Sequence, residues 1–120
     1  MPTESAIDQS RLRQTVGHLT ECLARGDYTG FCGLARRSRV SPKEVDTAIR
    51  EYGHRIVPLP AGAYGLLDVV AVRASIPPRW SVVVPLWTEQ EGRSDLSLEI
   101  TLEDVAGRDY AVEIEDLHVL

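Results

Sequence analysis

Residues 80–103 read WSVVVPLWTEQEGRSDLSLEITLE, and this stretch decides the fold class. Apolar residues occupy every second position in its first part and again in its last part. Such an alternation is typical of a strand with one face against a core and the other toward water, as antiparallel sheets allow. We therefore predict strands at 80–87 and 95–103, joined by a hairpin at 88–94 in which Gly92 supplies the turn.

The same alternation in residues 110–120 predicts a third long strand. After Glu115 the apolar phase slips, because Leu117 and Val119 take odd positions, and a β-bulge at this point would explain the slip. A shorter apolar run at 68–72 predicts a fourth strand.

The first half of the chain has the pattern of helices. One apolar stripe at helical spacing runs from Leu12 to Leu23, and Gly26 is a natural stop for that helix. A second, shorter helix is predicted from its N-cap Asp27 to the arginines at 36–39, which would close it.

A third helix has the strongest start signal. Ser41, Pro42 and Glu44 occupy the positions of a capping box with proline in the first turn, and Gly53 stops the helix. Residues 55–59 then form a short extended piece bounded by prolines.

The order of these elements predicts one α+β domain over residues 1–120. Its helical part, 5–53, would pack on one face of a four-stranded antiparallel meander in the sheet part, 55–120. A long N-terminal helix across a curved meander is the shape of cystatin-like and NTF2-like folds, by analogy of architecture alone.

The composition is that of an ordinary soluble globular protein, with 43% hydrophobic and 26% charged residues. No apolar run approaches the ~20 residues of a membrane helix, and the N-terminus lacks the basic start and apolar core of a signal peptide. We expect a cytoplasmic protein in which Cys22 and Cys32 are reduced thiols. Lys43 is the only lysine among 13 basic residues, which points to a GC-rich bacterial genome.

Charge is unevenly distributed along the chain. Residues 1–57 carry 9 Lys or Arg against 7 Asp or Glu, whereas residues 58–120 carry 4 against 11, which together give the net charge of −5. An acidic C-terminal half repels phosphate backbones, so we expect no nucleic-acid partner, and a basic protein partner would be attracted.

The C-terminal part combines three features: Leu-Trp-Thr at 86–88, the acidic turn followed by Ser-Asp-Leu at 94–96, and Asp-Leu-His-Val-Leu at 116–120. In this pattern the chain resembles a family of small, uncharacterised bacterial domains. The resemblance covers a third to half of the chain. It implies the architecture above, and it implies no activity, cofactor or catalytic residue.

Candidate catalytic and metal-binding patterns are weak. His18, His54 and His118 have no spacing that presents two ligands on one face, so we expect no metal and no cofactor. His118, beside Asp116, is the one histidine that merits a test, and its simpler interpretation is a strand histidine oriented by a carboxylate. There is no G-x-S-x-G elbow, and Cys22 lies among leucines as a core residue would.

Four carboxylates share one sheet face on the period-two pattern: Asp95, Glu99, Glu113 and Glu115. If the last two strands are neighbours, Glu99 and Glu113 could lie within cross-strand reach and form an acid–base pair. We favour the alternative of a solvated outer face whose acids are neutralised by Arg93 or Arg108, because a general acid needs a partly dry cleft.

The same face is a candidate surface for a protein partner. This predicted contact face comprises Trp87, Glu89, Arg93, Asp95, Glu99, Glu113 and Glu115. An exposed tryptophan with a charged rim resembles a binding hot spot, although Trp87 could equally fold over the hairpin as a small core. Sheet-to-sheet homodimerisation would use the same patch.

We therefore expect a non-enzymatic domain that binds a protein partner of basic character, and neither nucleic acid nor a membrane. One concrete form would be an immunity-type protein that neutralises a basic toxin. The alternative, from another class, is an NTF2-like small-molecule-binding or enzymatic cone. Its pocket would be lined by Tyr28, Tyr52, Tyr64 and Trp80.

Overall fold

The computed structural model describes residues 6–105 and 109–119. Its helices are α1 (Gln9–Arg25), α2 (Tyr28–Gly33), α3 (Pro42–Tyr52) and the 3-10 helix η1 (Ala61–Leu66). Its strands are β1 (Arg37–Ser38), β2 (Ile56–Val57), β3 (Asp68–Ala71), β4 (Arg79–Thr88), β5 (Gly92–Glu103) and β6 (Ala111–Val119). The predicted α+β class, with the helices N-terminal, is confirmed.

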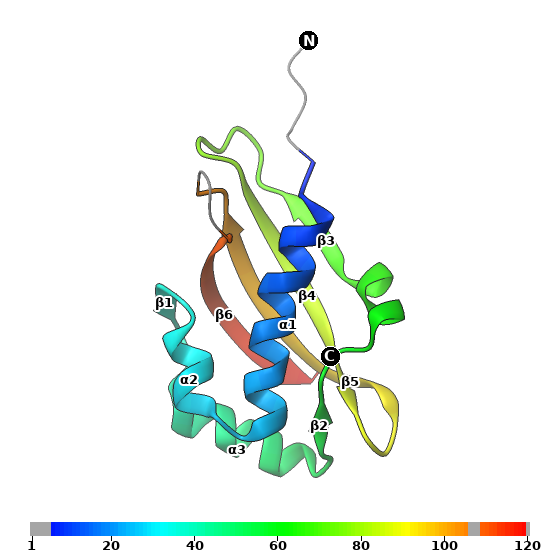
Figure 1. The fold of residues 1–120 in the computed structure, drawn as a ribbon. Helices are drawn as coiled ribbons and strands as arrows, with labels where there is room; N and C mark the ends of the chain where they lie inside the picture. The colour runs from blue at the N-terminus through cyan, green and yellow to red at the C-terminus, as the bar shows by residue number, and fades with distance from the viewer. Residues whose placement is uncertain (1–5, 106–108, 120) are drawn as a thin grey trace.

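The six strands of the described residues form one sheet in the order β1-β6-β5-β4-β2, and β3 also pairs with β4. β4, β5 and β6 form an antiparallel meander, whereas β1 adds to β6 in parallel. Figure 1 shows the sheet curling around α1, which lies across one face, with α2 and α3 at one end. We call the face that carries α1 the inner face and the opposite one the outer face.

The prediction of four strands was wrong, because β1 and β2 complete a sheet of six. A strand of two residues leaves no alternation to detect, and β1 consists of arginine and serine. Backbone bonds recruit it, since the N–H groups of Arg36 and Arg39 donate to carbonyls of β6 at 2.9 Å. The arginines therefore do not close α2, which ends at Gly33.

The predicted start of α3 and the predicted ends of α1 and α3 are confirmed. The Ser41 hydroxyl accepts from the N–H of Glu44 at 3.1 Å, and the Glu44 carboxylate accepts from the N–H of Ser41 at 2.9 Å, which is the predicted capping box. Gly26 and Gly53 end α1 and α3 in the left-handed conformation. Among the described residues there is no helix with the length and apolar character to cross a membrane.

Large apolar side chains fill the space between the helices and the sheet. The alternating residues of β4 and β5 predicted to face the core are at most 3% exposed: Trp80, Val82, Val84, Leu86, Leu96, Leu98, Ile100 and Leu102. Phe31 of α2, at 0% exposed, and the Leu12–Leu23 stripe of α1 belong to the same buried cluster. The interior is a packed core, and the two chain halves share it.

The predicted β-bulge lies in β6 at Glu115. Glu99 of β5 pairs with Asp116, whereas the next residue of β5 pairs with Ile114, so Glu115 is the extra residue. Beyond the bulge Leu117 returns to the inner face, where it is 7% exposed. The slip of the apolar phase in the sequence therefore has the cause that we inferred.

The predicted hairpin between β4 and β5 is confirmed, and it turns at residues 89–91 before Gly92, whose φ is 75°. Because a side chain raises the energy of this left-handed conformation, we expect Gly92→Ala to lower the free energy of unfolding by about 1 kcal/mol. As a control, a Cβ at Gly33 meets nothing within 4 Å, and Gly33→Ala should instead stabilise by about 0.5 kcal/mol. Urea denaturation measures both, and a neutral Gly92→Ala would contradict the argument.

Candidate functional site

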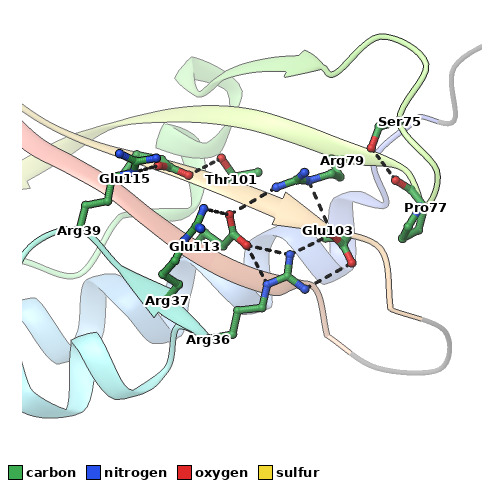
Figure 2. Close-up of polar contacts among 10 residues, drawn as sticks. All are labelled: Arg36, Arg37, Arg39, Ser75, Pro77, Arg79, Thr101, Glu103, Glu113 and Glu115. Carbon is green, nitrogen blue, oxygen red and sulfur yellow. Dashed lines mark hydrogen bonds and ion pairs between the residues drawn. The ribbon is translucent and has the colours of Figure 1, made fainter.

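A network of arginines and glutamates occupies the outer face near β1 (Figure 2). Its centre is Glu113 of β6, only 7% exposed. This carboxylate accepts hydrogen bonds from Arg36 and Arg37 at 2.9 Å and from Arg79 at 3.3 Å. Arg36 also donates to both oxygens of Glu103. The network therefore ties the segment around β1 to three strands of the sheet.

Glu115 is bound in the same way. It accepts from Arg39 at 2.9 Å and from the Thr101 hydroxyl at 2.8 Å. Two acids of the predicted contact face, Glu113 and Glu115, are thus neutralised inside the protein. The arginines that neutralise them come from the β1 segment and from β4; of the two that we expected, Arg93 takes no part in these bonds, and Arg108 lies outside the described residues.

The alternative of a cross-strand acid–base pair, which we did not favour, is contradicted by the register. Because of the bulge, Glu99 pairs with Asp116, and Glu113 pairs with Thr101. Glu99 and Glu113 therefore do not face each other across the strands.

In the arginine–glutamate network, the hydrogen bond from Arg36 lowers the pKa of Glu103 below its ordinary value, and the same contact raises the pKa of Arg36. Both groups are held in their charged forms, so neither is poised to move a proton at neutral pH.

Near the hairpin, the predicted contact face is less apolar than expected. Trp87 is half-buried, packs against the core, and has its indole Nε1 3.6 Å from where a Cβ of Gly92 would lie. Glu89 pairs with Arg55 at 3.6 Å. Arg93 lies opposite Trp87, and Asp95 is exposed. The contacts of Trp87 favour the small-core alternative over an exposed hot spot.

The outer face also brings together His118, Glu99 and Asp116. His118 Nε2 lies 3.1 Å from Glu99 Oε2, and its Nδ1 lies 3.1 Å from Asp116 Oδ2. Ser97, the cross-strand neighbour of His118, is 0% exposed, and its hydroxyl has no hydrogen-bond partner among the described residues. Serine, histidine and carboxylate are the components of a hydrolase triad, but a hydroxyl this buried is closed to a substrate. The sequence analysis singled out His118 and missed Ser97. Alternation assigns Ser97 to the outer face, but it cannot show that neighbouring side chains bury the Ser97 hydroxyl there.

Cys22 is buried and is not activated as a nucleophile. Cys22 and Cys32 are free thiols, and Cys22 is 6% exposed. Burial raises the pKa of the Cys22 thiol above its ordinary value, which disfavours the reactive thiolate. This agrees with the prediction of a packed core cysteine.

A groove runs between α3 and β6, and we call it the α3–β6 groove. Two adjoining hollows of about 390 and 420 Å³ form it and share the wall residues Ala48, Glu51 and Leu117. One hollow continues to Leu96 and Val119, and the other to Val40, Lys43, Glu44 and Asp116. The groove therefore has an apolar floor, and acidic side chains outnumber the single lysine on its rim. No pattern in the sequence indicated this groove, because its two walls, α3 and β6, begin 69 residues apart.

The four aromatic residues of the predicted pocket lie in separate surroundings. Trp80 packs on the Tyr110 ring at 5.2 Å inside the core. The Tyr64 hydroxyl donates to the Arg13 carbonyl on α1. The Tyr52 hydroxyl donates to Glu91 at 2.8 Å and accepts from the Asp95 N–H at 3.1 Å. Burial is the larger cause, and the hydrogen bond to Glu91 the second, of a Tyr52 pKa above its ordinary value. Tyr28 is half-buried at the start of α2. Of the four, Tyr52 alone lines the α3–β6 groove.

These features define a small α+β domain with a packed core, an ion-paired outer face and a groove beside its last strand. The chain belongs to a family described as a domain of unknown function, DUF7668, whose model matches residues 20–120. The predicted resemblance to an uncharacterised family is therefore confirmed, and it extends over most of the helical part as well. Neither the curated proteins nor the solved structures include a significant match to the chain.

Proposed function

We propose that this chain is a non-enzymatic, cytoplasmic protein-binding domain, and that it binds an extended, basic segment of its partner along β6. The observation that carries the proposal is the incomplete coverage of this strand. Within the described residues, the register pairs β1 with β6 at Glu113 and Ile114 alone, and the α3–β6 groove lies beside residues 116–119. A strand edge beside an apolar groove is the arrangement used in recognition by strand addition.

The chemistry of the groove supports a basic occupant. Its floor of Ala48 and Leu117 would take apolar side chains, and Glu51 and Asp116 on its rim would attract lysine or arginine. An extended segment that alternates apolar and basic residues would satisfy both at once. The acidic C-terminal half of the chain would steer such a segment toward this edge.

One carboxylate lies on the part of β6 that β1 leaves uncovered. Asp116 Oδ1 accepts a hydrogen bond from the N–H of Leu117 at 2.8 Å. Charged side chains at strand edges discourage indiscriminate pairing between copies of a protein. The proposal therefore places the contact surface beside α3, whereas homodimerisation through the sheet becomes an alternative outcome of the test. A bacterial source, an immunity-type role and a cystatin-like or NTF2-like architecture are compatible with this proposal.

The test is an NMR titration of ¹⁵N-labelled protein with a heptapeptide of alternating lysine and valine. We expect amide shifts confined to α3 and to β6 beyond the bulge, weakening as salt is raised. Glu51→Lys should lower the affinity by about tenfold, because it reverses a charge on the rim. Glu21→Lys is the matched control, since Glu21 is an exposed acid on α1 and the change in net charge is the same.

Two results would count against the proposal. Equal losses in both variants would indicate attraction to net charge alone. Shifts centred on Trp87 and the hairpin would move the contact surface to the predicted contact face. Sedimentation of the free protein at several concentrations shows whether it forms dimers without peptide, so homodimerisation is distinguished from both results.

A further inference from the structure

Three metal-ligating side chains meet on the outer face of β5 and β6, away from the arginine–glutamate network. Glu99, Asp116 and His118 each offer one ligand atom, and these atoms all lie within 4.8 Å of one another. Two metal–ligand bonds of about 2.0–2.2 Å span at most about 4.4 Å. His118 Nε2 and Glu99 Oε2 lie 3.1 Å apart, so one ion could bond to both atoms after small rotations of the side chains.

The β-bulge creates this cluster. In a regular strand Asp116 and His118 would alternate onto the inner face, because Ile114 lies there at 1% exposure. The extra residue, Glu115, turns Asp116 to the position opposite Glu99 and His118 to the position opposite Ser97. Bulges of this kind often redirect side chains at functional sites.

Ser97 is a second, independent observation at the same place. It is 0% exposed, its hydroxyl has no hydrogen-bond partner in the described part of the chain, and it lies beside His118 in the register. An unpartnered hydroxyl buried at this depth is unfavourable. A bound ion that carries a water molecule would give the Ser97 hydroxyl a hydrogen-bond partner.

We propose that this cluster binds a divalent transition-metal ion of the Zn²⁺ class, coordinated by His118 Nε2 and Glu99. One imidazole nitrogen with carboxylate oxygens suits Zn²⁺ and its neighbours, whereas Mg²⁺ and Ca²⁺ prefer oxygen alone. Asp116 Oδ2 lies 3.1 Å from the other ring nitrogen of His118, Nδ1, which has no hydrogen bond within the described part of the chain. A small rotation of the carboxylate would form the bond that fixes the tautomer and orientation of a metal-binding histidine, so we assign Asp116 as a positioning residue.

The test is calorimetric titration of the protein with ZnCl₂, together with Co²⁺ absorption spectra, which report the coordination of the ion. We expect saturable binding of one ion and a rise in melting temperature with Zn²⁺. His118→Gln and Glu99→Gln should each lower the affinity more than tenfold, and Asp116→Asn by about 10–100-fold. The control is His18→Gln, which removes an exposed histidine of α1 and should leave the affinity unchanged.

Equal affinities for the wild-type protein and His118→Gln would overturn the proposal, and so would a stronger effect of His18→Gln. If no ion binds and the fold is retained in all variants, the cluster is an ion pair of the protein alone. Circular dichroism of each variant without metal establishes the fold. The peptide titration described above is performed without metal, so the two proposals fail or succeed separately.

Discussion

Replacing Phe31 by alanine is expected to lower the free energy of unfolding by about 3–5 kcal/mol. Phe31 is 0% exposed and is among the largest fully buried side chains of the described residues. Its removal costs the transfer free energy of the ring and leaves a cavity between the helices and the sheet. Urea denaturation followed by circular dichroism measures the loss.

The matched control for Phe31 is Leu34→Ala. Leu34 follows α2, and its side chain is 46% exposed, so we expect a change within about 0.5 kcal/mol. The comparison also tests the alternative of a ligand-binding cone. If the space around Phe31 were an open pocket, the loss would be far smaller than 3 kcal/mol, and thermal stability would respond to small molecules.

Replacing Glu113 by alanine is expected to lower the free energy of unfolding by about 2 kcal/mol. Removing one member of a fully buried ion pair costs about 3–5 kcal/mol, and an exposed pair contributes at most about 1 kcal/mol. Glu113 lies between these limits, because its side chain is 10% exposed while those of Arg36 and Arg37 are 41% and 59% exposed. Three arginines would lose their shared acceptor at once, and their mutual repulsion adds to the loss.

Glu115→Ala is the control for Glu113. Its carboxylate is 27% exposed and its partner Arg39 66%, so we expect a loss below about 1 kcal/mol. Chemical denaturation in urea, which is uncharged, separates the two variants without screening the network. Equal losses would show that burial of Glu113 adds nothing to the pairing, and that β1 is held by its backbone bonds alone.

The elements with an apolar period or a turn signal could be predicted from the sequence, including the short strand β3 and the extended piece that contains β2, whereas β1 could not. The meander β4, β5 and β6 follows from apolar residues at every second position, and even the bulge at Glu115 left a visible slip. β1 left no such sign, because two residues cannot establish a period and its partner strand is 76 residues away. Its arginines were therefore assigned to the end of a helix.

For the candidate site, the residue types were visible in the sequence but their neighbours were not. Alternation correctly placed Glu113 and Glu115 away from the core, but it could not show that distant arginines would cover them. His118 and Asp116 were recognised as neighbours two positions apart in the sequence, whereas Glu99 and Ser97 joined them only through the shifted register of β5 and β6. Side-chain burial on an outer face depends on such tertiary neighbours.

The pairing of β1 with β6 also bears on when the chain can complete its fold. The bonds from Arg36, Arg37 and Arg39 to Glu113 and Glu115 span 76 or 77 residues. During synthesis the α-helices α1, α2 and α3 emerge well before β6, so part of their apolar surface stays uncovered until β6 has been made. Closing so long a loop is entropically costly and slow. Truncation after β5 would therefore leave a chain with an unpaired strand edge and a β1 segment without a sheet to join.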